Sequence, residues 1–324
     1  MLFATNRTPK ESQRSKRNRK ISFPVQKTRA SLDMYFCERN GVDDYTEIGS
    51  PAFFERLKNL PSNTQVLLYI HGFNNTAEPD IFPNAEELQR LIDQERGSNF
   101  AHVVPLMWPC DDDSPAAFID DYWDDQKAAD ASGIAFARML TKFDNWRKAE
   151  AAKPNPCTRR INILAHSMGN RVLRNAIATW GKHDHTGQVP QIFRNIFMVA
   201  ADVINHCLEP GEAAEFVPYA CRNLVVYYAN DDLAMPASKL ANLKNKTVSR
   251  RLGMTGPENM EVLPKNVFEV DCDDFNNTFD KPKGHSYFLA VNGKTSPALL
   301  HMLAAMEKGR VTPNDRSQEL EYDR

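Results

Sequence analysis

Several signatures that would assign a function at once are missing from this 324-residue sequence. Its six cysteines lie far apart and form no C-x-x-C pair, which argues against a zinc ribbon or a thioredoxin-like site. No apolar run approaches the roughly 18 residues of a membrane-spanning helix. The sequence also contains no G-x-x-x-x-G-K-S/T, G-x-G-x-x-G or H-E-x-x-H motif, so we expect neither a nucleotide cofactor nor a metal.

The charge of the chain is nearly balanced, with 40 Lys and Arg against 42 Asp and Glu. A net charge of -2 gives no bias towards nucleic acid or an anionic membrane, so we expect no nucleic-acid partner. The lack of a long apolar run leads us to expect no membrane span. Residues 8–30 are an exception, because nine Lys or Arg and a single acid lie between Arg7 and Arg29. No apolar segment follows them as in a signal peptide, so we expect a basic N-terminal arm or loop. Scattered cysteines in a chain with a large core are typical of reduced thiols, which predicts a cytoplasmic protein.

Short apolar runs rich in β-branched and aromatic residues alternate with helical patterns along the chain. The expected strands are Val66–Ile70, Val103–Met107, Ile161–Leu164, Ile196–Val199, Leu224–Tyr228 and Val267–Val270. The expected helices are Ala85–Gln94, Ala128–Trp146, Met168–Trp180 and Ala298–Glu307. Most of the strands are apolar on both faces, as in a buried parallel sheet. The alternation predicts an α/β fold, with a mostly parallel central sheet and helices on both faces.

We interpret residues 1–324 as a single domain. Two stretches interrupt the alternation, an acidic one at Asp111–Asp130 and a polar one at Ala241–Asn266. Either stretch is a candidate loop over an active site, although such stretches are more often plain surface insertions. The final polar residues, 312–324, are expected to be frayed.

The strongest local signal is Ala165-His166-Ser167-Met168-Gly169, which joins an expected strand to an expected helix. A nucleophile elbow has this context, because its serine occupies a strained turn that needs small residues two positions before and after it. Ala165 and Gly169 meet that requirement. Ser167 is therefore the candidate nucleophile, and the backbone N–H of Met168 at the start of the helix is a candidate oxyanion donor.

A second segment is expected to supply the other half of an oxyanion hole. The apolar run Val66–Ile70 leads directly into His71-Gly72-Phe73-Asn74. Hydrolases with such an elbow take their second donor from a loop after an early strand, just past a His-Gly pair. We expect this donor to be the N–H of Phe73, with Asn74 as the next candidate, while His71 holds the loop by hydrogen bonds.

The acid and the base are expected downstream of the nucleophile, in the order Ser, then Asp or Glu, then His. Asp232 follows the strand after next from Ser167 and is the preferred acid. Asp202, which ends the intervening strand, and Asp231 remain alternatives. His285 lies after the last expected strand and before the final helix, which makes it the candidate base. An aspartate at its Nδ1 would fix its tautomer.

Eight phrases of the sequence carry a family resemblance: Phe3-Ala4-Thr5-Asn6-Arg7, Tyr69-Ile70-His71-Gly72-Phe73-Asn74-Asn75, Trp108-Pro109, Ala165-His166-Ser167-Met168-Gly169-Asn170-Arg171, Ala200-Ala201-Asp202-Val203, Asn230-Asp231-Asp232-Leu233-Ala234-Met235, Arg251-Leu252-Gly253 and Gly284-His285-Ser286-Tyr287-Phe288. In this order they resemble the bacterial alpha/beta hydrolase family of unknown function DUF900. The resemblance implies the α/β-hydrolase fold and a Ser–Asp–His site. It favours Asp232 over Asp231, because Asp232 begins a match to the D-x-A-L part of the family's acid phrase. It implies no substrate.

The predicted chemistry is hydrolysis of an ester, thioester or amide bond through an acyl-enzyme, without a cofactor. A small substrate of the acyl-ester type is the first choice, because ester cleavage is the commonest chemistry on this fold. Two alternatives remain open. One is a lipase-like enzyme or acyltransferase with the same triad, and the other is a catalytically inactive binding module.

Overall fold

The computed structural model describes residues 1–110, 118–234 and 250–322, with the side chains of all of these except 118–121. Parts of both interrupting stretches, 111–117 and 241–249, lie outside the described residues, as does Met235 in the acid phrase. Whether either stretch covers an active site therefore stays a prediction. No helix in the described ranges is long and apolar enough to cross a membrane.

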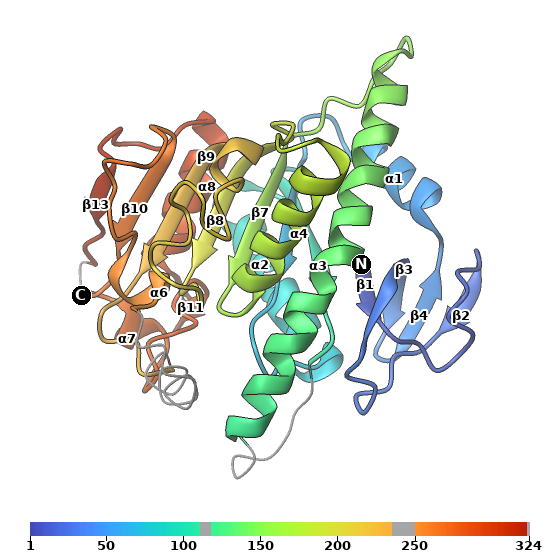
Figure 1. The fold of residues 1–324 in the computed structure, drawn as a ribbon, viewed down its shortest axis with the longest axis horizontal. Coiled ribbons are helices and arrows are strands. Elements are labelled where there is room, and N and C mark those ends of the chain that lie inside the picture. The colour runs from blue at the N-terminus through green and yellow to red at the C-terminus, as the bar shows by residue number, and fades with distance from the viewer. Residues whose placement is uncertain (111–117, 235–249, 323–324) are drawn as a thin grey trace.

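A large sheet forms the centre of the molecule (Figure 1). In the described part of the chain its strand order is β13-β10-β9-β8-β7-β5-β6-β1-β3-β4-β2. Neighbours from β13 to β1 are parallel, whereas β1, β3, β4 and β2 pair antiparallel. The strands are β1 Leu2–Arg7, β2 Arg19–Ile21, β3 Ala30–Gly41, β4 Asp44–Glu47, β5 Gln65–Ile70, β6 Ala101–Met107, β7 Ile161–His166, β8 Phe193–Val199, β9 Cys221–Tyr228, β10 Val267–Asp271 and β13 Ser317–Glu319, with β11 Ala290–Val291 and β12 Lys294–Thr295 in a separate pair. The predicted mostly parallel sheet is confirmed, and every expected strand belongs to it.

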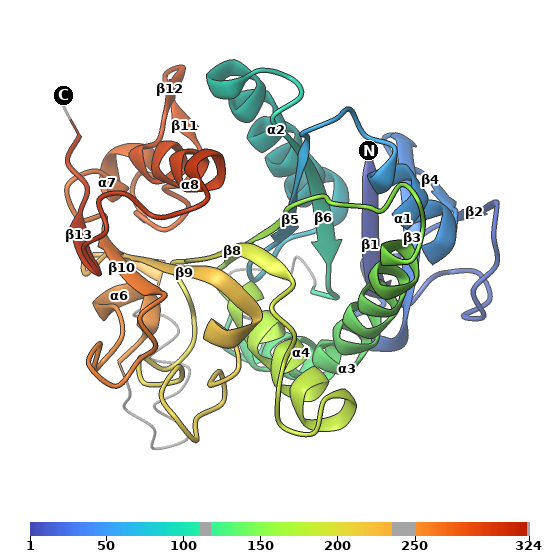
Figure 2. The same ribbon diagram turned by 90° about the horizontal axis from the view of Figure 1, so that it is seen from above.

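Helices cover both faces of this sheet (Figure 2). In that view α3 and α4 lie below the sheet, while α2 and α8 lie above it. The helices are α1 Ser50–Lys58, α2 Phe82–Arg96, α3 Phe118–Ala151, α4 Gly169–Asp184, α6 Leu252–Thr255, α7 Asn276–Phe279 and α8 Pro297–Lys308, with single turns at Ala77–Ile81 and Pro218–Ala220. A separate set of buried apolar side chains fills each face, which explains why the central strands are apolar on both sides.

The chain changes its direction of travel across the sheet between β5 and β7. From β5 it continues to β6 on one side, and from β7 it continues to β8 on the other. The two strands are parallel and stay in register to their ends, where Ile70 lies beside Ala165. Open α/β sheets bind ligands at the carboxyl ends of their strands, at such a switch point. The His-Gly segment and the Ser167 segment both begin there.

The acidic stretch differs from the expectation of a loop, because α3 begins at Phe118 and contains most of it. In this part of α3, Tyr122 and Ala129 are buried on one side of the helix, whereas Asp124 and Asp130 are exposed on the other. This is the burial pattern of an amphipathic helix. Acidic residues near the start of a helix also interact favourably with its dipole.

The two ends of the chain are also more ordered than expected. The basic segment 8–30 contains β2, which pairs with β4 at the sheet edge, and Arg19 Nε lies 2.7 Å from Oε2 of the buried Glu47. The final segment is not frayed throughout, because β13 pairs with β10. In both cases backbone pairing at a sheet edge orders a polar segment that has no hydrophobic pattern of its own.

Candidate active site

Ser167 occupies the turn between β7 and α4. Its φ is 53°, in the left-handed region that a non-glycine residue rarely adopts. Its N–H donates to the Val199 carbonyl at 3.0 Å, and its own carbonyl accepts from the N–H groups of Asn170 and Asp202 at 3.1 and 3.2 Å. These bonds hold the strained conformation that a nucleophile elbow requires.

Two residues after Ser167 close this turn, each in a different way. A Cβ on Gly169 would lie 2.5 Å from the His71 carbonyl oxygen, so only glycine fits against the end of β5. Asn170 is fully buried, and its Nδ2 donates to the carbonyls of Ala165 and Ser167 at 2.9 and 3.1 Å. The sequence indicated Gly169 by its size. The function of Asn170 was not predicted, because one asparagine after an elbow has no distinctive pattern.

The His71-Gly72 turn lies directly against Ser167. A Cβ on Gly72 would lie 3.0 Å from the Cβ of Ser167 and 3.1 Å from Nδ1 of His166. The Phe73 N–H therefore belongs to a loop that already contacts the candidate nucleophile. The N–H of Met168 makes no hydrogen bond with another described residue, as expected for a group at a helix N-terminus.

His71 holds this turn by hydrogen bonds. Its Nδ1–H donates to the Gly72 carbonyl at 2.9 Å, and its Nε2 accepts from the Trp108 N–H at 3.1 Å. The His71 ring also stacks on the Trp108 ring, with 5.2 Å between the centroids. Complete burial lowers the pKa of His71 to about 3. The ring therefore stays neutral near pH 7 and has both nitrogens engaged.

Asp232 and His285 meet on the loops that follow β9 and β10. The Nδ1–H of His285 donates to Oδ2 of Asp232 at 2.6 Å. The Asp232 side chain is completely buried, and its Oδ1 accepts from the Ala234 N–H at 2.9 Å. The His285 side chain keeps 13% of its surface exposed. A buried carboxylate at Nδ1 leaves Nε2 unprotonated, which is the form in which a histidine accepts a proton.

The two alternative aspartates have other partners. Asp202 is buried, accepts a hydrogen bond from the Tyr122 hydroxyl at 2.6 Å, and lies 3.3 Å from Nε of Arg251. Asp231 is exposed and accepts from Nδ2 of Asn276 at 2.5 Å. Within the described residues, neither carboxylate pairs with the candidate base. The geometry therefore favours Asp232 as the acid.

The loop that carries His285 is organised by Asp280. Its Oδ2 accepts from the N–H groups of both His285 and Ser286, at 2.8 and 2.7 Å. The loops of the acid and the base are also joined, because the Leu233 N–H donates to the Lys283 carbonyl at 2.8 Å. Asp280 was not predicted from the sequence. Its only signal is an acidic residue shortly before the histidine, which is common in turns.

His166 contacts the candidate base from the other side. Its Nε2–H donates to the backbone carbonyl of His285 at 3.2 Å, and the centroids of the two rings are 4.8 Å apart. The Phe288 ring packs on His166 at 5.0 Å. Burial, and then the charge of His285, lower the pKa of His166 well below its ordinary value. A neutral His166 thus limits the movement of His285 without competing for its proton.

The Ser167 hydroxyl makes no hydrogen bond to His285 among the described atoms, and 6% of the Ser167 surface is exposed. In free hydrolases this bond is often long and tightens only when substrate is bound. Among the residues that the structure describes, no group of three or more His, Cys, Asp or Glu side chains has a metal-binding arrangement.

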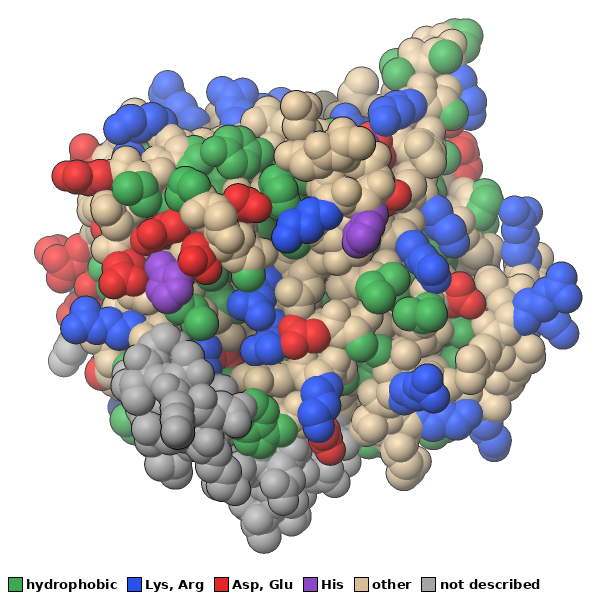
Figure 3. Space-filling view, in the orientation of Figure 1, with side chains coloured by type: hydrophobic (Ala, Val, Ile, Leu, Met, Phe, Trp, Pro, Cys, Tyr) green, Lys and Arg blue, Asp and Glu red, His purple; other side chains and the backbone are tan. Residues whose placement is uncertain are grey.

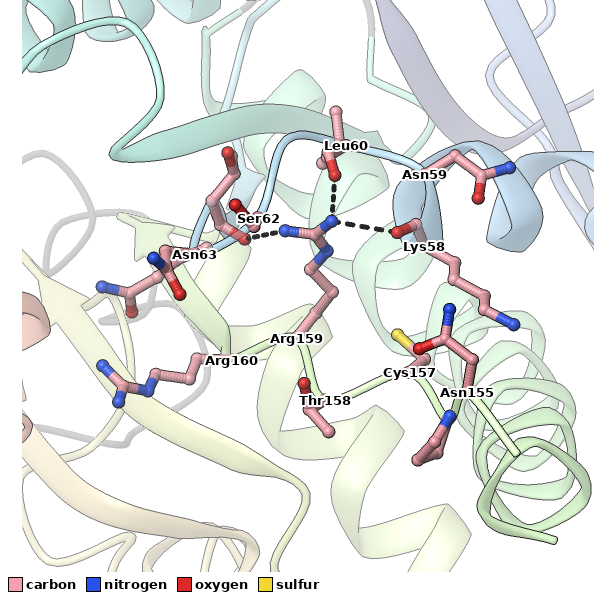
Figure 4. A pocket seen from close by; sticks show the side chains of 13 residues that line it. Lys58, Asn59, Leu60, Ser62, Asn63, Asn155, Cys157, Thr158, Arg159 and Arg160 are labelled. Atoms are coloured by element: carbon pink, nitrogen blue, oxygen red, sulfur yellow. Dashed lines mark hydrogen bonds between the residues drawn. The ribbon is translucent and has the colours of Figure 1, made fainter. Parts of the chain in front are cut away.

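A hollow of about 830 Å³ lies at the amino ends of β5 and β7, opposite the carboxyl ends where Ser167 lies (Figure 4). Arg159 crosses it and donates to the carbonyls of Lys58 and Thr64 at 2.9 and 3.1 Å. These bonds tie the end of α1 and the start of β5 to the start of β7. Ser167 follows the other end of β7, about 20 Å away at the usual rise per residue. We therefore interpret this hollow as structural.

The family model for alpha/beta hydrolases of unknown function (DUF900) matches residues 51–301. This span contains the His71-Gly72 turn, the Ser167 elbow, and both Asp232 and His285. No curated protein and no solved structure matches the chain. The family match covers most of the chain and agrees with the doubly wound sheet. The chain therefore belongs to the DUF900 family of alpha/beta hydrolases.

Proposed function

We propose that this chain is a serine hydrolase that cleaves a small acyl ester, or a thioester or amide, through an acyl-enzyme. One observation carries the proposal. A serine held at φ 53° follows β7, and a His285–Asp232 pair with a buried carboxylate, joined at 2.6 Å, lies on the loops after β9 and β10, at the same carboxyl ends of the parallel strands. The contact of Gly72 with Ser167 adds a backbone loop at the same place.

In the proposed mechanism, Nε2 of His285 takes the Ser167 proton as the serine oxygen attacks the carbonyl carbon. Asp232 stabilises the imidazolium that forms. The N–H groups of Met168 and Phe73 stabilise the negative charge on the former carbonyl oxygen. His285 then gives its proton to the leaving alcohol. Water attacks the acyl-enzyme with His285 again as base, which releases the acid and restores the serine.

Covalent labelling tests the proposal most directly. A fluorophosphonate probe should label the native protein, because its phosphorus is attacked by an activated serine. The Ser167→Ala variant, matched for folding by circular dichroism, should not be labelled. A folded native protein that resists the probe, and that also turns over no acyl ester, would favour the inactive binding module instead.

Turnover should increase with pH from the acid side, because the proposed base is a histidine. Only a neutral imidazole accepts the serine proton, so activity is low on the acid side. His71 and His166 cannot produce this change. Their pKa values are lowered by burial, so both are already neutral above pH 6. His285→Ala should remove the change together with most of the activity, measured by initial rates across pH. The same pH dependence persisting in that variant would require another base.

Hydrolysis should survive prolonged treatment with EDTA or phenanthroline. The proposed triad activates its own nucleophile, so no step needs a metal-bound water. Rates before and after dialysis against the chelator should agree within about twofold, a margin far smaller than the loss of an activated nucleophile would cause. Loss of activity that zinc or manganese restores would overturn the mechanism.

A further inference from the structure

Three arginines gather beside the candidate active site. Arg171 and Arg174 lie in the first two turns of α4, and Arg251 immediately precedes α6. Basic and acidic side chains lie next to one another near the middle of the face shown in Figure 3, where the lower half of α4 lies. We call these three residues the arginine cluster.

The cluster carries more positive than negative charge. Arg171 binds Asp130 with two bonds of 2.7 Å, which satisfies both groups. Arg174 comes no closer than 4.0 Å to Asp130, and Arg251 has its 3.3 Å contact with Asp202. Among the described residues, three guanidinium groups therefore share two carboxylates. Within that described part of the chain, one positive charge therefore has no carboxylate of its own.

Two of these arginines also have unsatisfied donors. The side chains of Arg174 and Arg251 expose only 13% and 6% of their surface. The Nε atoms of both are buried without an aligned hydrogen bond, and neither guanidinium makes any other hydrogen bond to a described residue. Burial, and then the charge of Arg171, lower the pKa of Arg174. Unsatisfied buried donors are costly and rare in proteins, and a bound ion can satisfy them.

The cluster connects directly to the elbow and to the oxyanion loop. The N–H of Asp202 donates to the Ser167 carbonyl at 3.2 Å. The carboxylate of the same Asp202 accepts from Tyr122, whose ring packs edge-on against the Phe73 ring at 5.7 Å. An anion at the cluster would therefore lie on the α4 side of the proposed reaction centre.

We propose that Arg171, Arg174 and Arg251 form a binding site for one carboxylate or phosphate group. Guanidinium groups donate two parallel hydrogen bonds to such oxyanions. A single unmatched positive charge suits one anionic group rather than a polyanion. The group belongs either to a free small anion or to the substrate, which in that case is an ester whose acyl part ends in an anionic group. The second source rests on the proposed hydrolase function.

Thermal unfolding in inorganic phosphate tests the site without any activity. Phosphate at about ten times its Kd should raise the Tm of the native protein by about 2 °C over sodium chloride of equal ionic strength. Arg174→Gln should lose this increase. Arg90→Gln, which removes an exposed arginine paired with Glu87 on α2, is the matched control and should keep it. An equal phosphate effect in native and Arg174→Gln proteins, or none in the native protein, would overturn the proposal.

The Tm without phosphate separates binding from a structural role. Arg174 makes no hydrogen bond to a residue that the structure describes, and its ion pair with Asp130 is long, at 4.0 Å, so Arg174→Gln should unfold at the native temperature or above it in sodium chloride. A Tm many degrees lower would show that the guanidinium stabilises the fold, and the anion site would be rejected.

Two matched esters distinguish the two sources of the anion. The mono-p-nitrophenyl ester of glutaric acid carries a terminal carboxylate, and p-nitrophenyl valerate is a neutral ester of similar length. If the anion is part of the substrate, Arg174→Gln should lower kcat/KM for the carboxylate ester at least about tenfold more than for valerate. A phosphate effect without this difference assigns the site to a free anion. If neither ester is hydrolysed, the proposed function fails, while the phosphate experiment still decides the site.

Discussion

Replacing Ser167 by alanine should lower the turnover of a p-nitrophenyl acyl ester by about four to six orders of magnitude. The hydroxyl is the proposed nucleophile, and no neighbouring group reproduces its position at φ 53° between β7 and α4. The remaining rate would come from the backbone donors and from binding alone. Burst kinetics with a chromogenic ester would measure both the active fraction and the loss.

Ser286 provides the matched control for this variant. It lies next to His285, and only its backbone N–H bonds to Asp280. Ser286→Ala should therefore keep turnover within about tenfold of the native rate, as expected for a change away from the reacting atoms. If Ser167→Ala also stayed within tenfold, Ser167 would not be the nucleophile, and the chemistry would have to be assigned elsewhere on the fold.

The central sheet was predictable because its strands are buried on both faces. Val66–Ile70 and Leu224–Tyr228 are short runs of β-branched and aromatic residues, and such runs separated by helical patterns have few other interpretations. The helix after Ser167 was equally clear, because Val172, Leu173 and Ile177 recur at helical spacing and are all buried. In these segments local pattern and tertiary burial agree.

The antiparallel part of the sheet was not predictable in the same way. β1 is buried along its whole length but ends in the polar residues Thr5, Asn6 and Arg7. Their partners are distant in the sequence. Nδ2 of Asn6 donates to the Ser132 hydroxyl at 2.9 Å, and Arg7 donates to the Cys110 carbonyl at 2.6 Å. A polar strand stabilised by long-range hydrogen bonds carries no local signal of burial.

The same distinction applies to the candidate site. Ser167, Asp232 and His285 were selected by chain order and by their position after strands, which topology determines. Asp280 and His166 act through hydrogen bonds to the backbone of His285, at 2.8 Å to its N–H and 3.2 Å to its carbonyl. Such contacts depend on how two loops meet. Neither spacing nor residue type could have indicated them.

Asp232→Asn should lower turnover by about 10⁴, the usual loss when the carboxylate that orients the base becomes an amide. An amide at the same place can present its NH₂ to Nδ1 of His285, which favours the tautomer with its proton on Nε2. That tautomer cannot accept the serine proton. Asp232 is fully buried and lies 2.6 Å from Nδ1, so the variant retains the shape of the site and loses only the charge. Steady-state kinetics on a short acyl ester, with circular dichroism to confirm folding, measures the loss.

Asp202→Asn is the decisive comparison, because Asp202 is also buried and also follows a central strand. Its carboxylate is bonded to Tyr122 and lies beside Arg251, so the amide should weaken that network and lower the Tm. It should leave the His285–Asp232 pair intact and cost far less turnover than Asp232→Asn. Asp231→Asn, at an exposed position, should cost less still. If Asp202→Asn caused the deeper loss while Asp232→Asn stayed near the native rate, the acid would follow β8 rather than β9. His285 would then have to leave Asp232 when substrate binds, because the two are joined by the shortest hydrogen bond His285 makes among the described residues.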